Sequence, residues 1–329
     1  MQHLLYVGRR AIGALEFHPA EELPRRAAEA EALEVAGLVA DARRIIAGDP
    51  DVSIPEIYRI GSSAGGVRPK AVVLYDPESG EVRSAFAPPR PGDIPAILKF
   101  DGVGDGSARG RLGEPQPFHR VEAAYARMAR DAGLEVVDVR VLESDEGHAH
   151  LVVRRFDRPL EEGLHQHTLG GLLHVDYNDP GASSYEEYLR TMLRLDMPPA
   201  AIIEGYRRMV FNVLAVNQDD HVKNLSFHMD RSGAWSLTPA YDVTFAKGAG
   251  FTATHQMRVG DKRSGIRRED LTRVARTFGV RNPDGIIDRT AEVLRRWPEH
   301  ARELGVPADT VRAIGSELRA RAAEVGVRA

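Results

Sequence analysis

Cysteine is absent from the 329-residue chain. Its absence excludes a disulfide scaffold and a thiolate metal site, and it fits a reducing compartment. Long apolar runs are absent too, because none approaches the roughly 18 uninterrupted residues of a membrane span. The opening MQHLLYVGRRAIGALEF has two arginines among its apolar residues, so it lacks the core of a secretory signal. We therefore expect a cytoplasmic protein with no membrane partner.

A strong excess of charge is also lacking. The net charge of −4 and the pI near 6.3 argue against bulk binding of nucleic acid or anionic membrane. Lysine is scarce, with five among the 44 basic residues. Where arginine is the usual cation, a lysine is expected at positions that need a compact ammonium group. Three of the five lie in the motifs described below: Lys70, Lys99 and Lys223.

The hydrophobic pattern changes near Phe156. Before it, strand-like runs recur, namely AIGALEF, KAVVLYD, EVRSAFA, IPAILKF, VDVRVLE and HAHLVVRRF, with one helix predicted over HRVEAAYARMARDAGL. After it, helical periodicity dominates, apart from a hairpin predicted in LSFHMDRSGAWSLTPAYDVTF with MDRSGAW as its turn. The pattern predicts an α+β protein with a sheet-rich lobe over residues 1–155 and a helical lobe over residues 156–329.

Lys99 lies inside the predicted strand IPAILKF. Strand alternation places it on the face opposite Leu98. The helix that follows carries Glu122, and a strand lysine paired with a helix glutamate is how kinases orient a cation on nucleotide phosphates. An edge lysine in water is the alternative interpretation.

The Gly-rich stretch GSSAGGVRPK, residues 61–70, is a candidate phosphate-binding loop. It is not a Walker A loop, because Val67 stands where lysine is required. A Gly/Ser turn suits a plain hairpin as well as a phosphate cradle. Hydroxyls and cations nearby favour anion binding: Ser62, Ser63, Arg68 and Lys70. We expect nucleotide contacts at Gly65, Gly66, Val67, Arg68 and Lys70.

The stretch NQDDHVKNLSF, residues 217–227, is a candidate catalytic loop. In protein kinases the catalytic aspartate and the metal-binding asparagine stand five positions apart in the pattern HRDxxxxN. Asp219 and Asn224 have this spacing, whereas Asp220 is one residue short. Asp219 is therefore the candidate base. The alternative is a polar turn after a buried helix.

Asp242, in PAYDVTF, stands where a kinase has the aspartate of its DFG triplet, a Mg²⁺ ligand. Val243 and Thr244 replace the Phe and Gly of that triplet. Histidines in GHAH, HQH and DDH raise the alternative of a metal-dependent hydrolase. No HExxH or facial-triad spacing links them.

Five motifs taken together, in this order, resemble the HipA family of bacterial serine/threonine kinases: SSAGGVRPK, ILKF, VRRFDR, NQDDHVKNLSF and AYDVTF. Members of this family are toxins of type II toxin–antitoxin modules. The core DxHxKN with a later YD is fairly specific to it. The resemblance implies a bilobal protein-kinase-like fold, ATP and Mg²⁺ as cofactors, and transfer of the γ-phosphoryl group to a protein serine.

The resemblance also implies roles for individual residues. Asp219 is the catalytic base, Asn224 and Asp242 bind Mg²⁺, and Lys99 contacts the nucleotide phosphates. Further nucleotide contacts are implied at His221, Lys223 and Tyr241, with a hinge for adenine and ribose at Arg154, Arg155, Phe156 and Asp157. The hinge often has glutamate where this chain has Arg154.

A serine in the Gly-rich loop of this family is phosphorylated by the kinase itself. Counting back from Lys70 places it at Ser63, with Ser62 as a possible second site. A phosphate dianion there would compete with ATP for the same amides and cations.

Partners are also implied by the resemblance. Family members attack aminoacyl-tRNA synthetases, which makes a synthetase the expected class of substrate. Longer relatives carry a small subdomain ahead of the segment that begins here at Tyr6, so we expect a separate small protein to bind the N-terminal lobe. A DNA-binding antitoxin would supply the basic surface that this acidic chain lacks, and DNA contact would occur only through it. A catalytically silent kinase-fold scaffold or co-repressor is the alternative from another class.

Overall fold

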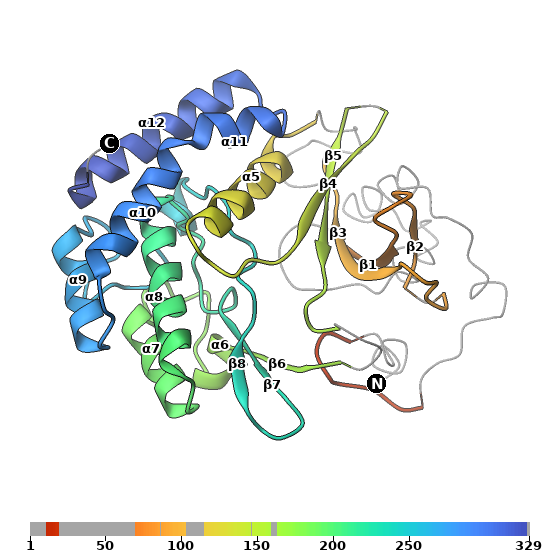
Figure 1. Ribbon diagram of the computed structural model, residues 1–329, viewed down its shortest axis with the longest axis horizontal. Helices are drawn as coiled ribbons and strands as arrows, with labels where there is room; N and C mark the ends of the chain where they lie inside the picture. The colour runs from red at the N-terminus through yellow and green to blue at the C-terminus, as the bar shows by residue number, and fades with distance from the viewer. Residues whose placement is uncertain are drawn as a thin grey trace. The chain divides into compact units, whose positions relative to one another are not determined.

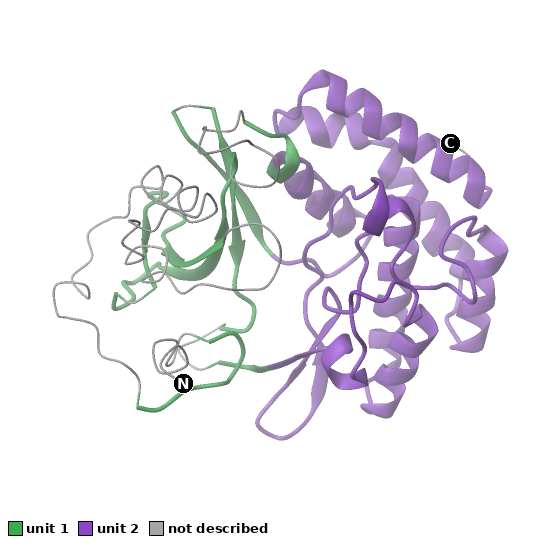
Figure 2. Ribbon diagram, turned by 180° about the vertical axis from the view of Figure 1, so that it is seen from behind, with its two compact units in different colours: residues 1–119, 138–165 green, residues 120–137, 166–329 purple. Residues whose placement is uncertain are grey.

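A computed structural model describes residues 11–19, 70–85, 87–102, 115–145, 147–158 and 163–327. The chain divides into two compact units, coloured green and purple in Figure 2, and their helices and strands are labelled in Figure 1. Unit 1 comprises residues 1–119 and 138–165, and unit 2 comprises residues 120–137 and 166–329. Among the described residues, no helix combines the length and apolar character needed to cross a bilayer.

Unit 1 contains an antiparallel sheet with the strand order β2-β1-β3-β5-β4. Its strands are β1 (Lys70–Tyr75), β2 (Val82–Ser84), β3 (Ile94–Lys99), β4 (Val139–Glu143) and β5 (Ala149–Arg154). In β3, Ala96 and Leu98 are fully buried, whereas Ile97 and Lys99 are half-buried. Because successive strand residues point to opposite faces, Lys99 lies on the other face from Leu98.

The strand predicted over AIGALEF is not formed, because residues 11–17 adopt turns and irregular backbone. Side chains from the end of the sheet bind this backbone instead. The Gly13 N–H donates to Asp157 Oδ2 at 2.8 Å, and Arg155 Nη2 donates to the Ala11 carbonyl at 3.0 Å. Backbone groups satisfied in this way need no strand ladder.

Unit 2 is mainly helical. Its helices are α5 (Phe118–Asp131, whose first two residues belong to unit 1), α6 (Leu169–Leu173), α7 (Tyr185–Arg194), α8 (Pro199–Leu214), the 3₁₀ helix η2 (Gly250–Ala253), α9 (Arg268–Thr277), α10 (Pro283–Arg295), α11 (Trp297–Glu303) and α12 (Ala308–Val325). A small sheet has the order β6-β7-β8, with β6 (His165–Thr168), β7 (Ser226–Met229) and β8 (Trp235–Leu237). The predicted hairpin is confirmed by the antiparallel β7–β8 pair.

Helix α8 is the centre of the unit 2 core. Pro199 at its first position favours helix initiation there, and its C-terminal half is buried almost all round. Tyr125 of α5 packs edge-on against Phe211 of α8 and donates its hydroxyl to the Ala215 carbonyl at 3.0 Å. These contacts assign most of α5 to unit 2, although the helix lies between strands of unit 1 in the sequence. They also fix the point where α8 ends and the predicted catalytic loop begins.

Candidate active site

The loop after α8 begins with a backbone conformation that is rare for its residue type. Val216 has φ 55°, which is unfavourable for a β-branched side chain. The turn is held by Asn217 N–H, which donates to the Asn212 carbonyl at 3.0 Å, and by Gln218 N–H, which donates to the Ala246 carbonyl at 2.9 Å. Residues held in such conformations cluster at functional sites, because the surrounding structure must stabilise them.

The adjacent aspartates of this loop have different environments. The Asp219 side chain is 42% exposed, whereas that of Asp220 is 1% exposed. Asp220 accepts hydrogen bonds from Tyr185 Oη at 2.8 Å, His255 Nδ1 at 2.9 Å and the Gln256 N–H at 2.7 Å. Both oxygens of Asp220 are therefore occupied, and Asp219 is the carboxylate that can accept a proton from an incoming group.

Asn224 closes the loop back onto Asp219. Its Nδ2 donates to the Asp219 carbonyl at 2.9 Å, and its N–H donates to the His221 carbonyl at 2.9 Å. The five-residue spacing thus corresponds to one closed turn. With Nδ2 engaged in this bond, Asn224 can offer its Oδ1 as a ligand to a cation.

The charge of Asp242 acts on the Asp219 carboxylate. Burial is the largest cause that raises the pKa of Asp219, His221 opposes it, and the charges of Asp242 and Asp220 raise it further. Asp242 itself has φ 52°. Two neighbouring carboxylates and an amide oxygen are the hard oxygen ligands that suit Mg²⁺. In the described part of the chain, no group of three or more His, Cys, Asp or Glu side chains is placed to hold a metal ion.

His221 and Lys223 contact aromatic rings that the sequence did not single out. The Lys223 Nζ lies 3.3 Å from the centroid of the Tyr177 ring. The His221 ring packs edge-on against Tyr177, with centroids 5.6 Å apart, and lies 6.2 Å from the centroid of Phe251. No motif or spacing marks Tyr177, in the turn after α6, or Phe251, in η2, because both lie outside the catalytic stretch. The Tyr177 ring contacts both His221 and Lys223, and Phe251 contacts His221.

Tyr241 supports the loop through its hydroxyl group. It donates to the Lys223 carbonyl at 2.6 Å and also hydrogen-bonds Ser226. Burial raises the pKa of this phenol above its usual value, so it remains protonated as a donor. These hydroxyl contacts are with the Lys223 backbone and the Ser226 side chain, and the nucleotide contact of Tyr241 stays a prediction.

In unit 1, Lys70 and Lys99 are direct cross-strand partners between β1 and β3. Opposed residues of an antiparallel pair place their side chains on the same face, where like charges repel. Two ammonium groups in this position suit a polyanion. Glu122, the predicted partner of Lys99, belongs to α5 in unit 2, so this ion pair stays a prediction.

The predicted hinge at the end of β5 is held by an ion pair. Arg155 Nη2 lies 2.6 Å from Asp157 Oδ2, and both side chains are buried. Burial alone would raise the pKa of Asp157, but the hydrogen bond and charge of Arg155, with the Gly13 N–H, lower it. Arg154 is exposed and Phe156 is half-buried. Nucleotide contacts at this hinge stay predictions.

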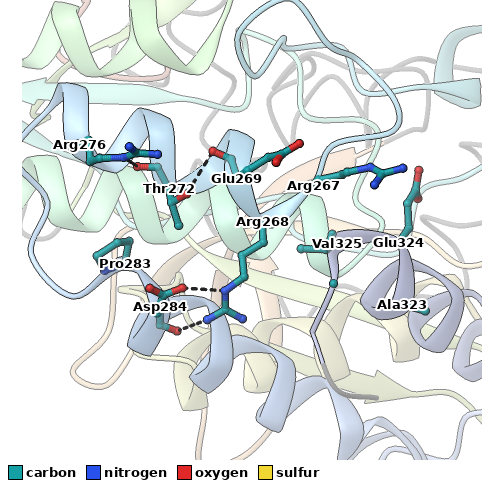
Figure 3. Close-up of a pocket in the computed structure, with 11 residues that line it drawn as sticks. Arg267, Arg268, Glu269, Thr272, Arg276, Pro283, Asp284, Ala323, Glu324 and Val325 are labelled. Atoms are coloured by element: carbon teal, nitrogen blue, oxygen red, sulfur yellow. Dashed lines mark hydrogen bonds and ion pairs between the residues drawn. The ribbon is translucent and has the colours of Figure 1, made fainter.

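The remaining predicted loop residues, Ser62, Ser63, Gly65, Gly66, Val67 and Arg68, lie outside the described residues. A different concavity of unit 2 lies between α9, α10 and the end of α12 (Figure 3). Across it, Arg268 Nε donates to Asp284 Oδ1 at 2.7 Å. None of the predicted site residues lines it.

Comparisons with known proteins agree with these motifs. A protein-family model described as the HipA-like C-terminal domain matches residues 62–324. A protein of Sinorhizobium fredii named "Putative kinase Y4dM" is 24% identical over 191 residues, which cover 54% of this chain and 46% of that protein. The chain thus spans about half the length of this curated relative.

Solved structures are similar over most of the chain. HipA in the Shewanella oneidensis MR-1 complex of HipA, HipB and operator DNA matches with a TM-score of 0.67 and 21% identity, over 97% of this chain and 76% of that one. The Helicobacter pylori proinflammatory kinase CtkA matches with a TM-score of 0.47 and 12% identity, over 80% of this chain and 90% of that one. The first likeness confirms the predicted α+β, bilobal kinase-like fold.

Proposed function

The chain belongs to the family with a HipA-like C-terminal domain, and we propose that it is an ATP-dependent serine/threonine kinase, the toxin of a type II toxin–antitoxin module. One observation carries the proposal: the half-buried Asp219 accepts a hydrogen bond at its carbonyl from Asn224, and burial, together with the charge of Asp242, raises the pKa of its carboxyl group. Kinases need a base and metal-binding groups aimed at one reacting phosphoryl group. The relative named as a kinase supports the same class of activity.

In the proposed reaction, a serine hydroxyl oxygen of the substrate protein bonds to the γ-phosphorus of ATP. The bond from that phosphorus to the bridging oxygen breaks, and ADP leaves. Asp219 accepts the proton of the hydroxyl group, and its raised pKa makes it a better proton acceptor than an ordinary aspartate. Lys223 would neutralise charge on the transferred group.

Asn224 and Asp242 would hold Mg²⁺, which would offset the charge of the nucleotide phosphates. Burial is the main cause of the raised pKa of Asp219, and the charge of Asp242 adds to it; a cation held here would offset this repulsion between the two carboxylates. Lys70 and Lys99, on one face of the unit 1 sheet, would bind phosphate oxygens. Further nucleotide contacts are proposed for residues of the catalytic loop, the Gly-rich loop and the hinge: His221, Lys223, Tyr241, Gly65, Gly66, Val67, Arg68, Arg154, Phe156 and Asp157.

Regulation and partners belong to the same proposal. We infer that the protein phosphorylates Ser63 in its own Gly-rich loop, with Ser62 as the alternative or second site. The Shewanella HipA structure is a complex with HipB and operator DNA, which supports a DNA-binding antitoxin as partner here. An aminoacyl-tRNA synthetase as substrate, and a small protein bound to the N-terminal lobe, are the further expectations.

The proposal is tested by incubating the purified chain with γ-labelled ATP and Mg²⁺. We expect label on the chain itself, located on residues 61–70 by peptide mass spectrometry, and none in Asp219→Asn. Phosphoproteomics after brief induction of wild type and Asp219→Asn would then identify the substrate. Bound nucleotide without any transfer would support the alternative of a silent kinase-fold scaffold instead.

A further inference from the structure

Asp220 is a buried carboxylate at which three separate parts of unit 2 meet. Its donors come from the start of α7 (Tyr185) and from the segment that follows η2 (His255 and Gln256). Tyr185 and His255 are each 35 positions away in the sequence and are fully buried. An acceptor-only group is required here, because three donors converge on it.

A chain of directional hydrogen bonds leads to Asp220 from α8. Asn217 Nδ2 donates to Asn212 Oδ1 at 2.9 Å, and Asn212 Nδ2 donates to Tyr185 Oη at 2.9 Å. Tyr185 then donates its only hydroxyl hydrogen to Asp220. Each amide is oriented by the next member, so the chain fixes the helix that precedes the loop and the loop itself in one arrangement.

Gln256 ties the catalytic loop to the segment beyond Asp242. Its N–H binds Asp220, and its Nε2 donates to the Gln218 carbonyl at 3.2 Å and the Thr254 carbonyl at 2.8 Å. The Phe251 carbonyl also lies within hydrogen-bond distance of this Nε2, so the three carbonyls share its two hydrogens. Gln256 thus hydrogen-bonds the residues on both sides of Asp219, namely Gln218 and Asp220. Residues 251–256 also carry Phe251, whose ring lies against His221.

We propose that Asp220 is a positioning residue that acts through its neighbour, holding Asp219 and residues 251–256 in one fixed arrangement. The inference rests on the proposed kinase function, in which Asp219 is the base. Asp220 itself is too buried to reach a substrate. An asparagine there has one acceptor oxygen for three donors, and its NH₂ group would face a donor. The loop must then shift, and misplacement by about 1 Å can lower a rate roughly 100-fold.

The kinetic test compares Asp220→Asn with Asp270→Asn in the full-length chain. Asp270 is a matched control, because it is equally buried and accepts hydrogen bonds from Lys262, Arg273 and the Arg267 N–H. We expect kcat per folded molecule to fall about 10- to 100-fold in Asp220→Asn, with KM for ATP within about twofold. Asp270→Asn should keep the wild-type kcat. Tyr185→Phe, which removes one donor of three, should show a smaller loss than Asp220→Asn.

Amide hydrogen exchange provides a readout that does not depend on activity. Asp220→Asn should speed exchange at Gln256 and across residues 251–256, and Asp270→Asn should not. If wild type transfers phosphate and the kcat of Asp220→Asn is equal to the kcat of Asp270→Asn and of wild type, the positioning role is wrong. If exchange in residues 251–256 is unchanged by Asp220→Asn, the role is wrong whether or not wild type is active. An inactive wild type with the expected exchange change would overturn the kinase proposal and leave the anchoring by Asp220 standing.

Discussion

Two charged sites, one in each unit, lie in opposite environments. In unit 1, Arg155 and Asp157 form a buried ion pair, and the pKa of Asp157 is lowered. In unit 2, Asp219 is half-buried, burial and then the charges of Asp242 and Asp220 raise its pKa, and the cation of the same loop, Lys223, lies over a tyrosine ring. The charged form of Asp157 is stabilised in the folded state, whereas the protonated form of Asp219 is favoured there.

This difference distinguishes a carboxylate that stabilises the fold from one suited to accept a proton. A carboxylate with a lowered pKa strengthens the folded state, and one with a raised pKa weakens it while being suited to take up a proton. Both regions carry residues that the sequence predicts for one nucleotide site. The observed contacts give Asp157 a structural role in holding the segment around Gly13. The predictions below test the contrast, beginning with the largest effect.

Asp219→Asn should separate activity from stability. Loss of a general base lowers kcat by about 10²- to 10⁴-fold. The folded-state pKa of Asp219 is raised, so the stability it costs the protein appears as pH rises through that pKa. Removing the charge should therefore leave the Tm at pH 7 equal to that of wild type or slightly higher. Timed ATP assays and thermal unfolding measure the two effects.

The control for this variant is Asp230→Asn. Asp230 lies in the exposed turn of the β7–β8 hairpin, where it accepts hydrogen bonds from Ser232 and Ala234. It should keep full activity. Near-wild-type transfer by Asp219→Asn would remove Asp219 from the role of base.

Asp157→Asn should show the reverse pattern, with a large loss of stability. Removing one partner leaves Arg155 buried without its counter-charge, which costs about 3 kcal/mol. Asp157 has a lowered pKa when folded, so its contribution is present above about pH 4 and is lost as pH falls through the lowered value. Urea unfolding at pH 7 and below about pH 4 measures this: the free energy of unfolding of Asp157→Asn should lie below that of wild type at pH 7, and the difference should become smaller in acid.

Asp76→Asn is a matched control within unit 1. This carboxylate lies in the turn after β1 and accepts hydrogen bonds from the Glu78 N–H and Ser79 Oγ. It should change stability much less than Asp157→Asn. An equal loss of unfolding free energy in both variants would mean that the Arg155–Asp157 ion pair does not specifically stabilise unit 1.

The strand lysines should affect binding rather than the chemical step. A charge-assisted contact contributes about 1.5–3 kcal/mol, so Lys99→Met or Lys70→Met should weaken ATP binding roughly tenfold or more. Calorimetric titration with ATP measures this. Lys247→Met, which removes a surface ion pair with Glu317, is the control and should bind ATP as wild type does. Unchanged affinity in both strand variants would remove this lysine pair from the phosphate site.

Regular elements were predictable because their signals are local. Strand alternation identified the face of Lys99, and turn residues identified the β7–β8 hairpin. The spacing of Asp219 and Asn224 likewise corresponds to one closed turn. All of these depend on residues close together in the sequence.

Side-chain contacts between distant segments were not predictable. Periodicity showed that α5 has an apolar face, but not that its Tyr125 packs on α8. The pattern of AIGALEF predicted a strand, and this prediction was wrong. Nothing in that stretch reveals that Arg155 and Asp157 bind its backbone. The donors to Asp220 belong to the same class of contact. A sequence indicates which groups need partners, while the fold decides which partners they receive.

The smallest expected effect concerns Tyr177 and sharpens the contrast between the two cations. Arg155 is fixed by a buried carboxylate, whereas Lys223 is held over the Tyr177 ring by a cation–π contact of about 0.5–1 kcal/mol. Nucleotide phosphates would have to draw Lys223 away from the ring. Tyr177→Leu should therefore tighten ATP binding by about two- to fivefold, and Tyr177→Phe, which keeps a π face, should bind ATP as wild type does. Weaker binding in Tyr177→Leu would instead make the ring part of the site that holds Lys223 ready for phosphate.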